Sequence, residues 1–179
     1  MVQFDSKWKE CRVLVTGGAS FIGSNLVDKL VELGAEVTVV DDLSAGKLEN
    51  LIRSANKYKF VKLDLEFITK KELDDIFRDQ EFVFHLAAVH GGRGYISKHP
   101  ADVCSNLAID HHVFQTCTDS NVEKIIFAST ACVYPTQLQE EIGSDYKLKE
   151  SDSNPKNLDG NMSADIEYGW GKLMSEIQL

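Results

Sequence analysis

Long hydrophobic runs are absent from this chain of 179 residues. No apolar stretch approaches the ~20 residues that a membrane-spanning helix needs, and residues 1–10 are polar with charges of both signs, unlike a signal peptide. Positive charge is also scarce, because 19 Lys and Arg face 28 Asp and Glu and leave a net charge of −9. We therefore expect neither a membrane nor a nucleic acid as a partner.

Cysteine is sparse, and its spacing excludes the usual cysteine-based sites. The four cysteines are Cys11, Cys104, Cys117 and Cys132, too far apart in the sequence for a zinc-type cluster. The five histidines also lack a metal-ligand spacing, so no metal is expected. A reduced, cytoplasmic protein is the simplest interpretation.

Apolar segments alternate with amphipathic ones along the chain, which has an ordinary hydrophobic content of 43% and the length of about one domain. Strands are expected at residues 12–15, 36–40, 58–63, 82–88 and 124–129, with helices ending at Leu33 and near Arg78 and spanning 101–120 and 165–179. Residues 135–160 are polar and irregular. This alternation predicts an α/β domain over residues 1–179, a Rossmann-type doubly wound parallel sheet with helices on both faces. Ligands of such sheets bind at the carboxyl ends of the strands.

The first expected strand runs directly into a glycine-rich segment, Thr16-Gly17-Gly18-Ala19-Ser20-Phe21-Ile22-Gly23. Glycine lets the backbone turn tightly, and the N–H groups of the helix that follows favour an anion. Strand, turn and helix in this order predict a site for the pyrophosphate of a dinucleotide. A glycine-rich turn without any ligand is the alternative.

The second expected strand ends in Asp41-Asp42, about 20 residues beyond the turn. An acid at this position accepts the hydroxyls of the adenosine ribose. A carboxylate would repel a 2′-phosphate, so the sequence favours NAD over NADP.

The last expected helix carries Tyr168 and Lys172, which share a helix face because they are four residues apart. A nearby ammonium and a cationic nicotinamide would lower the pKa of the tyrosine, which could then take a proton from a sugar hydroxyl. Thr130, after the fifth strand, could hold the same oxygen. The same spacing at Tyr58 and Lys62 falls in an expected strand and is accidental. The spacing therefore indicates a catalytic pair only because Tyr168 and Lys172 lie on a helix that follows the fifth strand.

These segments together resemble the extended short-chain dehydrogenase/reductase family, the NAD-dependent epimerases and dehydratases of nucleotide sugars. The matching segments are Thr16–Ser24, Val39–Gly46, Asp64-Leu65, His85–Ala88, Ser129–Pro135 and Tyr168–Lys172, in the order of the family. The resemblance implies catalytic roles for Thr130, Tyr168, Lys172 and Cys132. It implies cofactor contacts from Gly17, Ala19, Ser20, Phe21, Ile22, Gly23, Asp41, Asp42, Leu43, Ser44, Asp64, Leu65, Leu86, Ala87, Ala88, Asn106, Tyr168 and Lys172.

Two positions, Ser20 and Cys132, bear on how this chain compares with members of the family. Ser20 stands where the family usually has the middle glycine of its turn. Because serine is small and a good helix N-cap, we expect the turn to be less finely tuned for the dinucleotide but still to bind it. Cys132 matches a position that is a cysteine acid/base in the GDP-mannose 3,5-epimerase and GDP-fucose synthase branches. A small buried thiol without a chemical role is the alternative.

The chain ends at Leu179, shortly after Lys172, whereas the family continues into a smaller substrate domain. We expect a truncated product in which that domain is largely missing, and a homodimer that covers the last helix and the sheet edge. The expected function is transient oxidation of a hydroxyl on a nucleotide-diphosphate sugar. The alternatives are an NAD-dependent reductase of a nucleotide-linked keto sugar and a non-catalytic NAD-binding module.

Overall fold

The computed structural model describes residues 7–139, 145–154 and 164–179. The chain divides into two compact units, which are described separately below. The first unit comprises residues 1–88 and 112–128, and the second comprises residues 89–111 and 129–179. Part of the segment 135–160, predicted to be irregular, lies outside the described residues.

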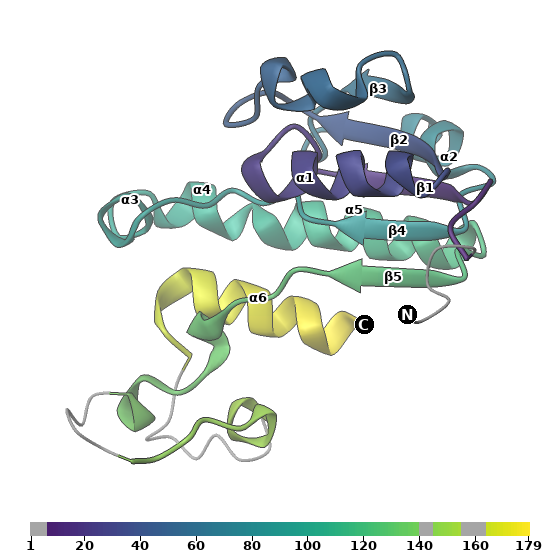
Figure 1. Ribbon diagram of the computed structural model, residues 1–179. Coiled ribbons are helices and arrows are strands. Elements are labelled where there is room, and N and C mark those ends of the chain that lie inside the picture. Colours follow the sequence, from purple (N-terminus) through teal and green to yellow (C-terminus); the bar gives the residue numbers. More distant parts are fainter. Residues whose placement is uncertain (1–6, 140–144, 155–163) are drawn as a thin grey trace. The chain divides into compact units, whose positions relative to one another are not determined.

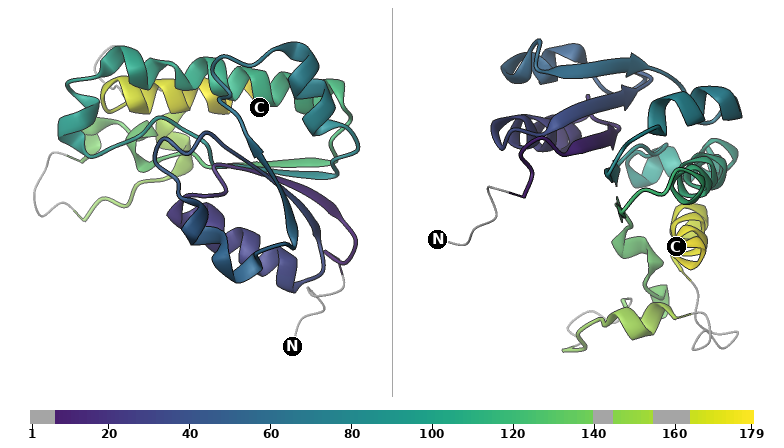
Figure 2. Two further views of the ribbon diagram at one scale, coloured as in Figure 1. Left: turned by 90° about the horizontal axis from the view of Figure 1, so that it is seen from above. Right: turned by 90° about the vertical axis from the view of Figure 1, so that its right-hand side faces the viewer.

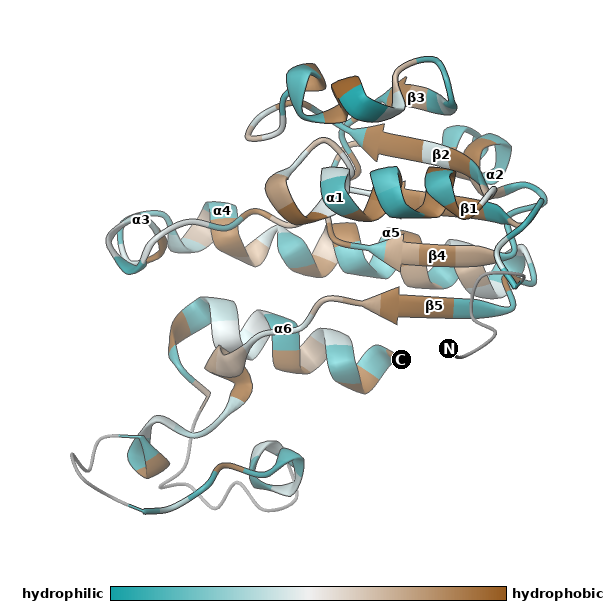
Figure 3. Ribbon diagram, in the orientation of Figure 1, coloured by the Kyte–Doolittle hydropathy of each residue, from teal (hydrophilic) through white to brown (hydrophobic). Residues whose placement is uncertain are grey.

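The first unit is built on a parallel five-stranded sheet in the order β3-β2-β1-β4-β5 (Figure 1). The strands are β1 (Arg12–Thr16), β2 (Glu36–Asp41), β3 (Tyr58–Lys62), β4 (Phe82–His85) and β5 (Lys124–Phe127). Hydrophobic residues dominate β1, β2 and β4 (Figure 3), as expected for strands covered on both faces. The strand order reverses at β1, so the crevice between the ends of β1 and β4 is the position where such sheets bind ligands.

Helices cover both faces of this sheet, as the sequence predicts. Helix α1 (Phe21–Glu32) lies on one face and α2 (Lys70–Phe77) on the other (Figure 2). Helix α5 (Asn106–Asp119) contributes its residues from His112 onward to the first unit. Val27 and Leu30 of α1 join the buried cluster that β1 and β2 form.

Local signals set the helix boundaries much as predicted. Gly34, at φ +85°, ends α1, with the Ala35 N–H donating to the Leu30 carbonyl 3.0 Å away. Thr69 and Glu72 form a reciprocal capping box at the start of α2. A short 3₁₀ helix, η1 (Leu48–Ser54), packs beside α1 and was not predicted.

The second unit contains α3 (Arg93–Ile96), α4 (Pro100–Cys104), the first part of α5 and α6 (Ile166–Gln178). Three short 3₁₀ turns lie among its described residues: η2 (Ala131–Val133), η3 (Thr136–Leu138) and η4 (Glu150–Ser153). Helix α6 packs against both α4 and η2. Val133, Ala164 and Leu173 form a small apolar cluster there.

Three predicted boundaries were wrong. The helix predicted at 101–120 is two helices interrupted at Ser105, whose hydroxyl takes the Asp102 carbonyl as an acceptor at 2.8 Å. The fourth strand ends at His85 and not at residue 88, because the next two N–H groups turn toward the Thr16 hydroxyl. The fifth strand ends at Phe127 and not at residue 129.

Candidate active site

The glycine-rich turn of the first unit is packed so closely that side chains are excluded from it. A Cβ on Gly17 would lie 2.8 Å from the Ala87 nitrogen, and Gly17 has φ +67°. A Cβ on Gly23 would lie 2.2 Å from the Gly17 carbonyl oxygen. These approaches allow α1 to begin directly behind β1, with the N–H groups of its first turn available to an anion.

Ser20 is the N-cap of α1, in the role that the sequence predicts for it. Its Oγ lies 3.3 Å from the Gly23 nitrogen and 2.6 Å from the Gly17 carbonyl oxygen. Its backbone has φ −77° and ψ 176°, which any residue adopts, so glycine is not required there by conformation. Phe21 and Ile22, the next two residues, are 82% and 69% exposed. The entrance of α1 therefore presents an apolar surface beside the N–H groups.

Asp41 is buried at the end of β2 and faces the turn. Its Oδ2 accepts from the Ala19 N–H and its Oδ1 from the Leu43 N–H, both at 2.9 Å. Leu43 is held at φ +64°, an uncommon conformation for a non-glycine residue. Gly46 lies against the same carboxylate, since its Cβ would meet Oδ1 at 2.7 Å. Asp41 thus links the glycine turn to the loop that follows β2.

The crevice between β1 and β4 is closed by the Thr16 hydroxyl. Its Oγ1 accepts from the N–H groups of Leu86 and Ala87, both at 3.2 Å, and lies 2.7 Å from Nδ1 of the buried His85. This arrangement sets the spacing that Gly17 needs against Ala87.

The remaining cofactor residues predicted in the first unit lie in the loops after β2 and β3, apart from Ala88, which lies in the loop after β4. Asp42 is exposed, and its Oδ1 accepts from the N–H and the hydroxyl of Ser44. Asp64 accepts from the Glu66 N–H at 2.9 Å. Leu65 is buried, and its carbonyl oxygen lies 2.9 Å from Nδ1 of His112. Cofactor contacts from these residues stay predictions.

In the second unit, the start of α6 is fixed against the turn that carries Thr130 and Cys132. The Asp165 N–H donates to the Cys132 carbonyl at 2.8 Å. A Cβ on Gly169 would lie 2.2 Å from that carbonyl oxygen, so glycine is required for the approach. Thr130 caps η2 by accepting from the Cys132 N–H at 3.2 Å. Tyr168, one residue before Gly169, therefore lies on the turn of helix that packs against η2.

The ionisation of Tyr168 and Lys172 is shaped by burial. Burial raises the pKa of Tyr168 above its ordinary value, with smaller contributions in the same direction from Cys132 and Asp110. Burial also lowers the pKa of Lys172, while Asp110 opposes that change. The reduced tyrosine pKa expected from the sequence is therefore wrong for the chain by itself, in which burial shifts the pKa of Tyr168 upward.

Sequence reasoning missed the partner of Lys172. Asp110 of α5 is fully buried, and its Oδ2 lies 3.5 Å from the Lys172 ammonium and 2.6 Å from the Ser175 hydroxyl. A carboxylate between Ile109 and Val113, on the buried side of a helix, is the signal that could have found it.

Asn106 begins the same helix and is almost fully buried. Its amide accepts from the Val89 N–H at 2.7 Å and donates to the Val89 carbonyl at 2.8 Å. Both polar atoms of the side chain hold the loop after β4, so the predicted direct contact with a cofactor stays a prediction. Arg93 of that loop pairs through both terminal nitrogens with Asp165, the N-cap of α6.

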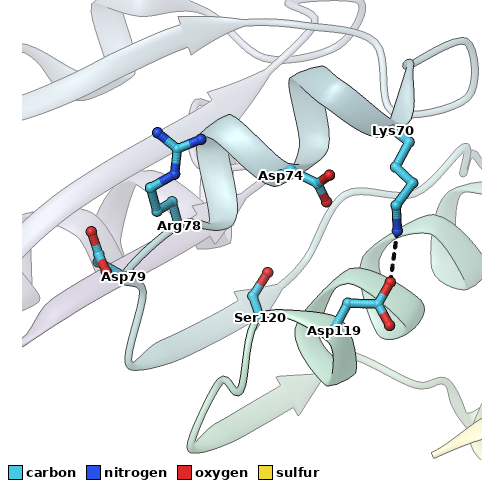
Figure 4. Close-up of a pocket in the computed structure, with 6 residues that line it drawn as sticks. All are labelled: Lys70, Asp74, Arg78, Asp79, Asp119 and Ser120. Carbon is cyan, nitrogen blue, oxygen red and sulfur yellow. Dashed lines mark hydrogen bonds and ion pairs between the residues drawn. The ribbon is translucent and has the colours of Figure 1, made fainter.

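A pocket of about 550 Å³ opens elsewhere on the first unit (Figure 4). It is lined by Lys70, Asp74, Arg78, Asp79, Asp119 and Ser120, with an ion pair of 2.8 Å between Lys70 and Asp119. Lys70 and Asp74 lie on α2, Arg78 and Asp79 connect α2 to β4, and Asp119 and Ser120 connect α5 to β5. The two connections place this side of the pocket at the amino ends of β4 and β5. It is separate from the glycine turn, which lies at the carboxyl ends.

The described residues contain neither a membrane-spanning helix nor a metal-binding cluster. None of the helices there has the length and apolar character of a bilayer-crossing segment. Among those residues, no group of three His, Cys, Asp or Glu is arranged to hold a metal ion. None of the four cysteines, all of which are described, forms a disulfide.

A strand-turn-helix site at the switch point of a 3-2-1-4-5 sheet is typical of a Rossmann-type dinucleotide-binding fold, and a helix with Tyr and Lys four residues apart follows later in the chain. The family model described as "NAD dependent epimerase/dehydratase family" matches residues 13–177. The chain belongs to this family, whose cofactor is NAD.

Individual relatives agree with this assignment. The chain is 36% identical over 130 residues to the UDP-glucose 4-epimerase of Mycolicibacterium smegmatis (70% of this chain, 41% of the relative). It is 29% identical over 169 residues to GDP-mannose 3,5-epimerase 1 of Oryza sativa subsp. indica (94% and 41%). The structure of the Thermus thermophilus UDP-glucose 4-epimerase in complex with NAD matches with a TM-score of 0.73 and 30% identity (93% and 49%). In each case the chain spans less than half of the relative's length.

Proposed function

We propose that this chain binds NAD and takes part in the epimerisation or dehydration of a nucleotide-diphosphate sugar through transient oxidation of a sugar hydroxyl. The observation that carries the proposal is the packing of α6 on η2. Gly169 and the hydrogen bond from Asp165 to Cys132 bring the tyrosine helix against the turn that carries Thr130. This packing supports a common site for the two hydroxyl groups.

The residues of the first unit fit NAD. The turn around Gly17 and Gly23 has no room for side chains, so a pyrophosphate could approach its backbone closely. The 12-residue helix α1 directs its first N–H groups and its positive dipole end toward that space. The Asp41 carboxylate, fixed by two backbone N–H groups, is suited to ribose hydroxyls and opposes a 2′-phosphate.

The chemistry follows from the residues of the second unit. Bound NAD would supply a reversible two-electron oxidant. Tyr168 would accept the proton of the sugar hydroxyl, and Thr130 would hydrogen-bond to the same oxygen. Lys172 would favour the phenolate through its positive charge, which is needed because burial raises the pKa of Tyr168.

Cys132 is the candidate for the proton transfer that makes the reaction an epimerisation. It is half-buried and close enough to Tyr168 for its negative charge to raise the tyrosine pKa. A thiolate there could remove a proton from a carbon next to a ketone and return it. The 29% identity to a GDP-mannose 3,5-epimerase supports this role.

The proposal extends to partners and location. The substrate class is a nucleotide-diphosphate sugar, since the relatives are named for UDP- and GDP-sugars. Trp170, Met174 and Ile177 form an exposed apolar stripe on α6, which supports a homodimer. Four cysteines without a disulfide support a cytoplasmic location.

The test is to incubate the chain with NAD and either UDP-glucose or GDP-mannose. NADH is followed by its near-ultraviolet absorbance and the sugar by NMR. We expect NADH or an epimerised sugar, and a loss of about 100-fold or more in Tyr168→Phe. Tyr58→Phe is the matched control, because Tyr58 has the same spacing to Lys62 but lies in β3. Binding of NAD without any turnover, and no effect of Tyr168→Phe, would identify a non-catalytic binding module instead.

The role of Cys132 has its own readout. In D₂O, an active enzyme with a Cys132 acid/base incorporates deuterium at the epimerised carbon, and Cys132→Ala removes that incorporation while NADH formation remains. An active enzyme that incorporates no deuterium would rule the role out.

A further inference from the structure

Lys172 and Asp110 form a buried ion pair whose carboxylate has no part in the proposed chemistry. Lys172 is 2% exposed and Asp110 0% exposed, and their charged atoms are 3.5 Å apart. Both residues belong to the second unit, on α6 and α5. Transfer of two charges from water into a protein interior is costly, so a pair of this kind calls for an explanation beyond stability.

A third residue fixes the carboxylate. Ser175, also 0% exposed, donates from Oγ to the same Oδ2 of Asp110 at 2.6 Å. Its contact with the Gly171 carbonyl is longer, at 3.1 Å. Since a hydroxyl has one proton, the contact with the carboxylate is the stronger of the two. Ser175 follows Lys172 by three residues, so α6 itself sets the position of Asp110 relative to the ammonium.

The effect of Asp110 on Lys172 is opposite to that of burial. Burial favours the neutral amine and lowers the pKa of Lys172, whereas the charge of Asp110 and its hydrogen bond raise it. The other titratable groups on the elements around Lys172 are Glu167, Tyr168 and Glu176 on α6, Cys132 on η2, and Asp102 and Cys104 on α4. Asp102 and Cys104 are exposed, and Asp102 pairs with His99. Helix α5 carries His111, His112, Cys117 and Asp119 in addition to Asp110. Asp110 is the carboxylate in contact with the ammonium.

We propose that Asp110, held by Ser175, is a positioning residue that keeps Lys172 protonated and in place one helical turn from Tyr168. Its catalytic consequence rests on the proposed function, because a charged Lys172 is what favours the Tyr168 phenolate. The effect of Asp110 on the protonation of Lys172 can be measured without any turnover of substrate.

The experiment follows the titration of Lys172 directly. The chain is produced with ¹³C at the lysine ε-carbons, the Lys172 signal is assigned by its absence in Lys172→Arg, and the pH is raised from about 6 to about 11, a range that spans the ordinary lysine pKa. We expect Lys172 to be protonated at about pH 7–8 in the wild type. Asp110→Asn should lower its midpoint by about 1–3 pH units. Asp119→Asn is the matched control, because Asp119 lies on the same helix but pairs with the surface residue Lys70.

Further variants keep the test decisive. Asp110→Glu, which retains the charge, should restore most of the shift. Asp110→Ser removes the charge with a smaller side chain and replaces Asp110→Asn if the latter does not fold. A wild-type midpoint below about pH 7, or an unchanged midpoint in a folded charge-removing variant, would overturn the proposal.

The activity of the same variants separates this inference from the proposed function. In an active enzyme, the basic limb of the pH–rate profile should move down with the Lys172 midpoint in Asp110→Asn and stay in place in Asp119→Asn. If the wild type forms neither NADH nor a converted sugar and yet Asp110→Asn shifts Lys172, the proposed function fails while the role of Asp110 in holding the charge stands.

Discussion

The two units build their parts of the site from different materials. In the first unit, backbone groups and the absence of side chains at Gly17 and Gly23 shape the turn, and a large apolar cluster supports it. In the second unit, three buried polar side chains, Lys172, Asp110 and Ser175, lie beside a small apolar cluster. A site made of backbone tolerates no added atoms, whereas a site made of buried charges tolerates no missing partner.

The largest loss of folding stability should come from breaking the Lys172–Asp110 ion pair of the second unit. Lys172→Met leaves the Asp110 carboxylate buried without its counter-charge, which should lower the free energy of unfolding by about 4 kcal/mol. Lys70→Met removes an exposed pair in the first unit and should have no measurable effect. Urea unfolding of both variants checks the difference. Equal losses would mean that burial does not distinguish the two pairs.

The next effect should come from adding one carbon where α6 approaches η2. Gly169→Ala places a Cβ against the Cys132 carbonyl and should cost about 3 kcal/mol. Gly171→Ala, two residues away on the same helix, meets nothing within 4 Å and should be neutral or stabilising. Melting temperatures of the two variants make the comparison. A tolerated Gly169→Ala would show that the close packing of α6 on η2 is not needed.

A pH effect should come from the first unit. Burial raises the pKa of Cys117 to about 12 from 9.0. The folded chain therefore keeps a proton that the unfolded chain releases above about pH 9. The associated stability is complete below about pH 9 and is lost toward about pH 12, by up to about 1.4 kcal/mol per pH unit. Urea unfolding at about pH 8 and about pH 10 should show a steeper loss in the wild type than in Cys117→Val. Parallel losses would contradict the assignment to this thiol.

The smallest change in folding stability should come from substitutions of Ser20, the residue with a side chain at the usual position of a glycine in the turn. Ser20→Gly should change the free energy of unfolding by only a few tenths of a kcal/mol, and Ser20→Ala should cost about 1 kcal/mol through loss of the N-cap. Thermal unfolding of the two variants measures both changes. A large loss in Ser20→Gly would show that the contact of Oγ with the Gly17 carbonyl matters more than the cap.

Features set by neighbouring residues could be predicted from the sequence, and features set by the packing of distant residues could not. The parallel sheet with helices on both faces, the turn after the first strand and the Ser20 cap follow from patterns in the sequence and were predicted correctly. The break at Ser105 and the early end of β4 depend on individual hydrogen bonds that compete with regular secondary structure. The periodicity of the sequence does not reveal this competition. Asp110 and Ser175 belong to helices and lie 65 residues apart in sequence, so only packing brings Asp110 to Lys172.

The proposed function depends most on the binding of NAD at the glycine turn of the first unit, with Asp41 accepting hydrogen bonds from the ribose hydroxyls. Calorimetric titration of the chain with NAD and with NADP tests it most directly, with Gly23→Ala as the damaged turn and the exposed Gly94→Ala, whose Cβ meets nothing within 4 Å, as the matched control. We expect saturable binding of NAD, much weaker binding of NADP, loss of NAD binding in Gly23→Ala and wild-type binding in Gly94→Ala. A folded wild-type chain that binds neither dinucleotide would contradict it.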